Sequence, residues 1–181
     1  MMNDKPKQAP TERAAPSAPS EPRRPSSPVC YAHEMESLHA GHLDEAELVE
    51  LLNTLLEGER AGDKLALAFL RESPSEEATV LLAAVKRDEA RFAAMLERLI
   101  ERLGAKPSAR VGDFYDMAMA IEGFAARLAF LNRGQGWVVR KLQAALPRVK
   151  DERIHAALKG MLGAHEANIA RCAALLRTIP Q

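Results

Sequence analysis

Apolar residues recur at alternating steps of four and three along four stretches of this chain, the spacing that places them on one face of an α-helix. No stretch shows the period-two alternation that is typical of a half-buried β-strand. The four predicted helices cover about residues 44–72, 75–104, 112–146 and 150–178. Because breaks between them are mostly short, the pattern predicts an all-α domain over residues 43–179, built as an antiparallel four-helix bundle.

Capping and helix-breaking residues support these boundaries. Asp44 begins a capping-box pattern, and Ser75 is a second candidate N-cap after a proline-containing break. Pro147 closes the third stretch, since proline cannot continue a helix without losing a backbone hydrogen bond. Gly134 and Gly136 interrupt that same stretch, so we expect the third helix to kink or divide there.

Four ionisable residues stand near the middle of these helices, where apolar residues are expected. Glu59, Glu89 and His165 lie on the apolar seams themselves, and Glu122 lies one position, about 100°, away from its seam. At a rise of about 1.5 Å per residue, the first three lie about 21–22 Å from their helix starts, and Glu122 about 15 Å. In an antiparallel bundle, groups at these heights share one layer.

Buried carboxylates in one layer need compensation, because an unpaired buried charge costs several kcal/mol and a domain's net stability is only about 5–15 kcal/mol. Protonation is one solution, and ion pairs are another. Glu59 has Lys64 and Arg127 as candidate partners, and Glu89 has Arg133. A divalent metal ion compensates the whole layer best, since carboxylates and imidazole are its usual oxygen and nitrogen ligands. The layer therefore predicts a metal centre.

Composition narrows the classes of partner. The 25 basic and 25 acidic residues cancel, whereas nucleic-acid binding usually depends on a basic surface, so no nucleic-acid partner is expected. No apolar run approaches the about 20 residues of a membrane span, and the N-terminus lacks a secretory signal. Two cysteines are too few for a disulfide framework. We expect a cytoplasmic protein without a membrane partner.

The residues that precede the helical domain differ from it in composition. Residues 1–28 are rich in proline, serine and charge, which predicts a disordered tail. The lead-in segment, residues 29–42, contains four residues of metal-binding type: Cys30, His33, His39 and His42. Their spacing matches no zinc motif. The segment is either a chance cluster or a cover that folds over one end of the bundle and the metal centre.

Each of the four ionisable residues stands within a short motif. The motifs are residues 55–61 (LLEGERA), 86–92 (KRDEARF), 120–123 (AIEG) and 162–165 (LGAH). Together they resemble the iron-binding motifs of the ferritin-like superfamily, in particular the carboxylate-bridged di-iron bundles of rubrerythrins and bacterioferritins. The resemblance spans roughly residues 43–178. It implies a ferritin-like fold, iron or manganese as cofactor, and an oxidoreductase that activates oxygen or peroxide.

Two positions depart from these motifs. Phe92 stands where the family has its first histidine, and Leu162 stands where the family has a bridging glutamate. Three carboxylates and one histidine suit one metal ion better than two, although both numbers stay open. Glu166 is a less favoured candidate ligand, because its position places it on a neighbouring face of the helix.

The connection between the second and third helices also bears on the resemblance, because ferritins cross the full length of the bundle at this point. Residues 104–111 reach about 28 Å when fully extended, and the bundle is about 40 Å long. The short connection favours an up-down-up-down order, unless the start of the third helix itself forms the crossover.

Two functional hypotheses follow. The first is a metal-dependent oxidoreductase with a small-molecule substrate, whose metal ligands are Glu59, Glu89, Glu122 and His165. The second is a non-catalytic bundle whose polar layer fixes helix register and partner choice, which the two absent ligands favour. An iron store would require a cage, for which the sequence offers no indication. Oligomeric state stays open, with a homodimer among the expectations.

Overall fold

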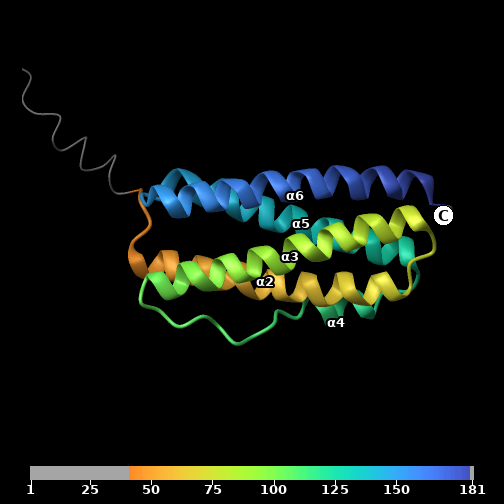
Figure 1. Ribbon diagram of the computed structural model, residues 1–181, viewed down its shortest axis with the longest axis horizontal. Coiled ribbons are helices and arrows are strands. Elements are labelled where there is room, and N and C mark those ends of the chain that lie inside the picture. The colour runs from red at the N-terminus through yellow and green to blue at the C-terminus, as the bar shows by residue number, and fades with distance from the viewer. Residues whose placement is uncertain (1–40, 180–181) are drawn as a thin grey trace, which may run out of the picture.

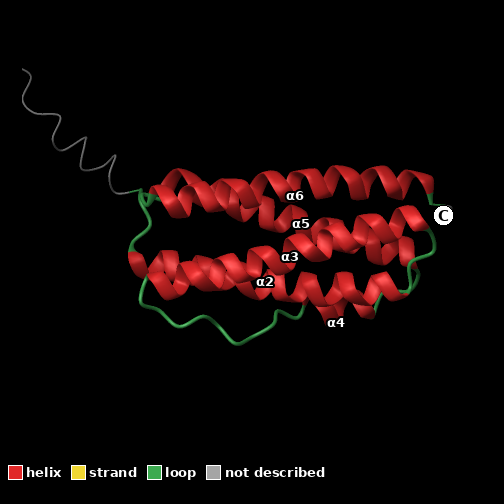
Figure 2. Cartoon of the chain, viewed as in Figure 1, coloured by secondary structure: helices red, strands yellow, loops and turns green. Residues whose placement is uncertain are grey.

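The computed structural model describes residues 41–179, and these contain helices and no strand (Figure 2). The elements are α2 (Glu45–Arg71), α3 (Glu76–Arg102), α4 (Phe114–Met119), α5 (Phe124–Ala145), the 3-10 turn η1 (Leu146–Arg148) and α6 (Glu152–Thr178). The predicted all-α class is confirmed for this part of the chain. The tail and most of the lead-in segment, with Cys30, His33 and His39, lie outside the described residues.

The helix ends follow the local sequence signals closely. The Asp44 carboxylate accepts a hydrogen bond from the Glu47 backbone N–H at 2.8 Å, and the Glu47 carboxylate accepts one from the Asp44 N–H at 2.9 Å. The Ser75 hydroxyl oxygen caps α3 by accepting from the Ala78 N–H at 3.2 Å. Each interaction satisfies a backbone donor that lacks a partner within its own helix, which fixes where the helix begins.

The third predicted helix is divided in two, and the division falls elsewhere than expected. Gly123, with φ of +84°, separates α4 from α5, and glycine adopts this left-handed conformation without steric cost. The predicted break at Gly134 and Gly136 is wrong, because both lie inside the continuous α5. Gly134 instead permits close packing, since a Cβ atom there would lie 2.8 Å from Cε2 of Phe114 on α4.

The path of the chain follows from contacts at the two ends of the molecule. The four-residue connection 72–75 makes α3 antiparallel to α2, and α5 is also antiparallel to α2 (Figure 1). The start of α5 meets the end of α2 through Arg127 and Glu72, whose charged groups are 2.5 Å apart. Past the end of α5, Arg148 pairs with Glu47 near the start of α2 at 3.2 Å. Hence α3 and α5 run in the same direction.

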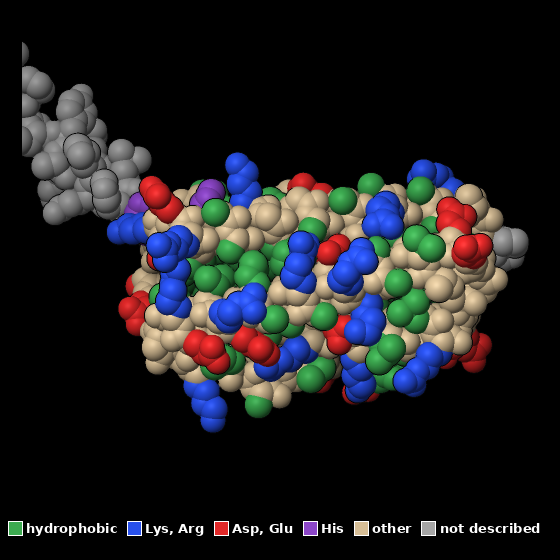
Figure 3. All heavy atoms as spheres, in the orientation of Figure 1, with side chains coloured by type: hydrophobic (Ala, Val, Ile, Leu, Met, Phe, Trp, Pro, Cys, Tyr) green, Lys and Arg blue, Asp and Glu red, His purple; other side chains and the backbone are tan. Residues whose placement is uncertain are grey.

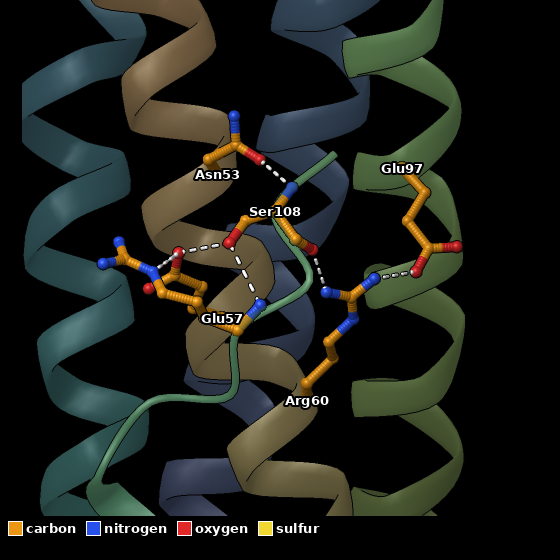
Figure 4. Close-up of polar contacts among 6 residues, drawn as sticks. Asn53, Glu57, Arg60, Glu97 and Ser108 are labelled. Carbon is orange, nitrogen blue, oxygen red and sulfur yellow. Dashed lines mark hydrogen bonds and ion pairs between the residues drawn. The ribbon is translucent and has the colours of Figure 1, made fainter. Parts of the chain in front are cut away.

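The segment between α3 and α5 therefore crosses the length of the molecule, and polar contacts hold it along α2 (Figure 4). The Ser108 N–H donates to Oδ1 of Asn53 at 2.7 Å, and the Ser108 hydroxyl donates to Oε1 of Glu57 at 2.6 Å. Arg60 donates to the Ser108 carbonyl oxygen, and also to Oε1 of Glu97 on α3 at 2.6 Å. The crossover is thus attached to α2, and Arg60 links this attachment to α3.

The expected up-down-up-down order is wrong for this reason. The predicted length of the connection was based on residues 104–111 alone, whereas the crossover in the structure extends over residues 103–123 and includes α4. The alternative, in which the start of the predicted third helix forms the crossover, describes the observed path. Twenty-one residues are ample for that distance, because even the helical part advances about 1.5 Å per residue.

The hydrophobic core consists of two clusters, one toward each end of the long helices. The first cluster includes fully buried side chains from α2, α3 and α6: Leu52, Leu56, Leu96, Ile100, Leu158 and Met161. The second includes Leu65, Phe69, Leu82, Leu128, Leu131 and Leu175. The buried polar residues, Glu59, Glu89, Gln135, His165 and Asn168, belong to neither cluster. Their heights along the helices place them between the two.

Charged side chains cover the outside of the helices. Lysine and arginine are interspersed with aspartate and glutamate over the face that Figure 3 shows, with no large area of a single sign. Within residues 41–179, no helix has both the length and the apolar character needed to cross a lipid bilayer.

Candidate metal centre

Three of the four predicted residues meet in the middle of the core. Glu59 comes from α2, Glu89 from α3 and His165 from α6, and one potential ligand atom of each lies within 4.8 Å of the others. The exposed fractions of these residues are 0%, 3% and 1%, so bulk water does not solvate them. The three seams that carried the prediction therefore converge as expected.

The imidazole of His165 is oriented by its own helix. Its Nδ1 lies 3.1 Å from the carbonyl oxygen of Met161, one turn earlier, and as an N–H it donates to that oxygen. In the neutral ring, this leaves the lone pair of Nε2 free. Nε2 lies 3.3 Å from Oε1 of Glu59, and neither this nitrogen nor either Glu59 oxygen has a hydrogen-bond partner. A metal-binding histidine is commonly held in this tautomer by a backbone carbonyl.

The Glu89 carboxylate is positioned by α2 and α5. Nε2 of Gln135 on α5 donates a hydrogen bond to Oε1 of Glu89. On α2, Gly62 leaves the space that this carboxylate occupies, since a Cβ atom there would lie 2.7 Å from Cδ of Glu89. Gly62 is therefore part of the centre, because any larger residue would displace the carboxylate.

Burial changes the acidity of both carboxyls. It raises the pKa of Glu59 to about 8; the contact with Glu89 acts in the opposite direction, and the negative charge of Asp88 adds to the rise. The pKa of Glu89 is raised well above its ordinary value, first by burial and then by the charge of Glu59. Without a cation, the pair therefore retains protons at neutral pH. A divalent cation would favour the ionised form of both.

The positively charged residues that could have compensated the two buried carboxylates lie elsewhere. Nζ of Lys64 lies 3.8 Å from the centroid of the Tyr115 ring, and Arg127 pairs with Glu72. The Arg133 guanidinium lies 5.3 Å from the centroid of a phenylalanine ring. Within residues 41–179, neither buried carboxylate pairs with lysine or arginine. The ion-pair alternative is therefore not realised.

Two predicted candidates lie away from the centre. Glu122 is exposed and stands in the break between α4 and α5, because the chain leaves the helical conformation just before Gly123. Its expected place on a helical face was wrong. Glu166 is exposed on α6, where it accepts a hydrogen bond from Gln143 at 3.4 Å. The adjacent His165 and Glu166 face opposite surroundings, since successive helical residues differ by about 100°.

Two buried polar residues were not predicted from the sequence. Gln135 continues the seam of Leu128 and Leu131 by a step of four, and the expected break at the nearby glycines hid this continuation. Asn168 lies three residues after His165, on the same face of α6, and its Nδ2 donates to Oδ2 of Asp88 at 3.2 Å. Both could have been found by extending the seams through the motifs.

Phe92, at the position where the ferritin-like motif has a histidine, makes an aromatic contact with His165. The Phe92 ring lies 5.6 Å from the imidazole of His165, centroid to centroid, with an interplanar angle of 39°. Phe92 is buried and offers no ligand atom, so it closes one side of the centre with apolar surface. Leu162 is half-buried against the first hydrophobic cluster.

These residues fit one divalent ion better than two. Two ionised carboxylates balance the charge of a single dication, and the neutral imidazole adds a nitrogen ligand. With bonds of about 2.1 Å, adjacent ligand atoms on one ion lie about 3.0–3.4 Å apart. The 3.3 Å between Nε2 of His165 and Oε1 of Glu59 falls in that range. Three protein ligands would leave coordination positions open to a small molecule.

A protein-family model described as "Domain of unknown function (DUF6306)" matches residues 46–174, which is most of the chain. The chain belongs to this family. The DUF6306 match contains all three residues of the centre together with the crossover and α4. None of the curated proteins and none of the solved structures matches the chain significantly. The function of this DUF6306 protein is therefore inferred from the geometry of its centre.

Proposed function

We propose that this protein binds one divalent transition-metal ion, iron or manganese, through Glu59, Glu89 and His165. The observation that carries the proposal is the set of buried ligand atoms without hydrogen-bond partners, namely both Glu59 oxygens and Nε2 of His165. An unsatisfied buried polar group costs about 1–3 kcal/mol, and more when it is charged. One cation at the centre would satisfy all three atoms at once.

The chain path supports a ferritin-like four-helix bundle as the architecture around this ion. In that architecture, one long crossover joins the two helical pairs, and ligands project inward from facing helices. Here residues 103–123 cross between α3 and α5, which run in the same direction. The glutamates of α2 and α3 and the histidine of α6 project into the core, as the sequence motifs suggested.

We propose an oxidoreductase that acts on oxygen or peroxide as the reaction class. When bound, iron or manganese supplies redox and Lewis-acid chemistry. The protein's residues hold and shield the ion. Met161 fixes the tautomer of His165, Gln135 orients Glu89, and Phe92 excludes water from one side. Because the pKa values of the two glutamates are raised in the absence of an ion, metal uptake would release the protons that this pair retains at neutral pH.

Elemental analysis of protein purified without added metal tests the metal site. We expect close to one iron or manganese per chain, and loss of this metal in Glu59→Ala. Calorimetric titration with Mn(II) provides a readout that does not depend on activity. Glu166→Ala is the matched control, since this exposed glutamate lies next to the centre in sequence but points away from it. Less than about 0.1 metal per chain, unchanged by Glu59→Ala, would reject the proposal.

The second candidate function is a non-catalytic bundle with a metal-free polar layer. It is favoured by the 3.3 Å approach of Glu59 to His165, because a protonated carboxyl at that position can donate to Nε2. Such a layer costs stability and fixes register. His165→Leu then raises the melting temperature, and wild-type protein takes up no metal. Under the metal proposal, the same substitution abolishes Mn(II) binding.

A further inference from the structure

A cavity of about 520 Å³ lies beside the centre, between α2, α5 and the segment that includes α4. Its lining includes Met117, which is 53% exposed, and Glu89, which is 3% exposed. The cavity therefore leads from the surface to a carboxylate of the centre. None of the side chains of the centre other than Glu89 lines it.

Glycines let three large groups pack closely around this cavity. Gly58 and Gly62 lie one turn apart on the same face of α2, and Gly134 lies on α5. A Cβ atom at Gly58 would lie 3.5 Å from Cζ3 of Trp137, which is van der Waals contact. The Glu89 carboxylate and the Phe114 ring occupy the spaces at Gly62 and Gly134, so these side chains and Trp137 form the wall of the cavity.

Aromatic side chains form much of the remaining wall. The Phe114 and Phe130 rings stack with their centroids 4.7 Å apart and an interplanar angle of 18°. Trp137 is half-buried and lies opposite Gly58. Rings of this kind bind another planar ring through offset or edge-to-face contacts, each worth about 0.5–1.5 kcal/mol beyond burial.

The inner end of the cavity carries one unsatisfied acceptor. Gln135 lines the cavity and is 3% exposed. Its Nε2 is used by Glu89, but its Oε1 has no hydrogen-bond partner. A ligand that fills the cavity therefore needs a hydrogen-bond donor at its inner end. Of the other charged lining residues, Asp113 and Arg133 are exposed, and Glu57 already pairs with Arg110. A charged ligand would therefore have no free buried counterpart in the cavity other than Glu89.

We propose that this cavity binds a small, neutral aromatic alcohol of the phenol class. The ring lies in the cavity against the aromatic wall of Trp137, Phe114 and Phe130, and the hydroxyl donates to Oε1 of Gln135, next to Glu89. An opening for oxygen alone would need neither this volume nor an unsatisfied acceptor. The role of the cavity as a substrate site rests on the proposed function, whereas binding of the phenol requires no metal.

The chain contains a single tryptophan, Trp137, so intrinsic fluorescence reports directly on this cavity. Metal-free full-length protein is titrated with para-cresol, excited at the red edge of tryptophan absorption. We expect a saturable change. Para-methylanisole has the same ring but no hydrogen-bond donor, and we expect it to bind about tenfold more weakly, as the loss of one hydrogen bond implies. Free N-acetyltryptophanamide corrects for collisional quenching.

Two variants locate the site. Gly58→Leu adds a side chain that pushes Trp137 into the cavity, and we expect para-cresol binding to fall at least tenfold while Mn(II) binding is retained. Gly160→Leu is the matched control, because Gly160 lies on α6 outside the cavity, where an added Cβ atom would meet nothing within 4 Å. Gln135→Leu should remove the preference for para-cresol over para-methylanisole.

Three outcomes overturn the proposal: a linear, unsaturable response to para-cresol, equal affinity for para-cresol and para-methylanisole in wild-type protein, or wild-type affinity in Gly58→Leu. Elemental analysis separates this proposal from the previous one. Para-cresol binding with no metal uptake supports the cavity site and rejects the metal function. Metal uptake with no para-cresol binding does the reverse.

Discussion

Glu57 and Glu59 are two residues apart on α2, yet they occupy opposite electrostatic environments. Glu57 lies at the surface, where the Ser108 hydroxyl donates to it and Arg110 pairs with it at 3.0 Å; these contacts lower its pKa. Glu59 points into the core, where burial raises its pKa to about 8 and, within residues 41–179, neither lysine nor arginine pairs with it. One helix therefore presents one satisfied carboxylate and one unsatisfied carboxylate.

The difference shows what identifies a candidate ligand. Both residues are glutamates in the same helix turn, so neither residue type nor local composition distinguishes them. Their partners differ: residues of the crossover donate hydrogen bonds to Glu57, whereas Glu89 and His165 approach Glu59 without satisfying its oxygens. Substitutions at the two positions should therefore have different consequences, and each of the following experiments tests that contrast.

Metal affinity should show the largest difference. Glu59→Gln removes one of two anionic ligands, and we expect Mn(II) affinity to fall about a thousandfold, or about 4 kcal/mol. Glu57→Gln should change it less than about twofold, since Glu57 lies outside the centre. Isothermal titration calorimetry of both variants measures the contrast. Equal losses in the two would show that general destabilisation, not ligation, controls metal binding.

The pH dependence of the metal-free protein should be the next largest effect. Between the ordinary pKa of 4.5 and the folded-state pKa of about 8, folded Glu59 binds more protons than the unfolded chain. The free energy of unfolding therefore falls as pH rises, by about 3 kcal/mol between about pH 5 and pH 8. Glu89 adds to this fall, and Asp88 and His165 also face the group. Urea unfolding across this range measures it.

Variants test the sign of this pH dependence. Glu59→Gln removes the ionisable group, so we expect its unfolding free energy to vary less between pH 5 and pH 8 than that of the wild type. Glu57→Gln should keep the wild-type fall, because the lowered pKa of Glu57 makes its contribution present above its unfolded pKa and lost only at acidic pH. Stability that rises with pH in the metal-free wild type would contradict the assignment of raised pKa values.

A pair of glycines on α2 offers a smaller and purely steric contrast. Gly62→Ala would place a Cβ atom 2.7 Å from Cδ of Glu89, and we expect a loss of about 2 kcal/mol in unfolding free energy. Gly58→Ala meets only Trp137 at 3.5 Å, and the gain in helix propensity should stabilise the protein by up to about 1 kcal/mol. Chemical denaturation measures both, and the same sign for the two would refute the close approach.

The smallest effect should come from the surface contacts of Glu57. Glu57→Ala removes the acceptor of the Ser108 hydroxyl, one of the contacts that attach the crossover to α2, and we expect this loss to cost about 1 kcal/mol. Arg110→Ala should cost less than about 0.5 kcal/mol, because its side chain is 81% exposed. Hydrogen exchange in residues 105–113 provides the local readout. Unchanged exchange in Glu57→Ala would show that other contacts hold the crossover.

The helices and three residues of the centre were predictable because they depend on local periodicity. The seams through Glu59, Glu89 and His165 are continuous over about six turns, so their faces could be assigned without knowing the neighbours. Position along each helix then placed the three at one height. Caps such as Asp44 fixed those heights to within a residue or two.

The errors arise where the chain departs from regular helix. Periodicity places Glu122 on a helical face, but it does not reveal that Gly123 adopts a left-handed conformation. Gly134 resembles a helix break in the sequence, whereas tertiary contact with Phe114 explains its size. The length of the crossover was not predictable, because it depends on how much of the predicted third helix is helical.

The division of the core into two apolar clusters has a consequence for cooperativity. The four long helices pass through both clusters, but the buried side chains that we place between the clusters are polar, and three of them, Glu59, Glu89 and His165, are titratable. Interactions across that boundary therefore vary with proton and cation concentration, whereas those within each cluster do not. With the proposed ion bound, the two ends should open together in native-state hydrogen exchange, and without it they should open as separate units.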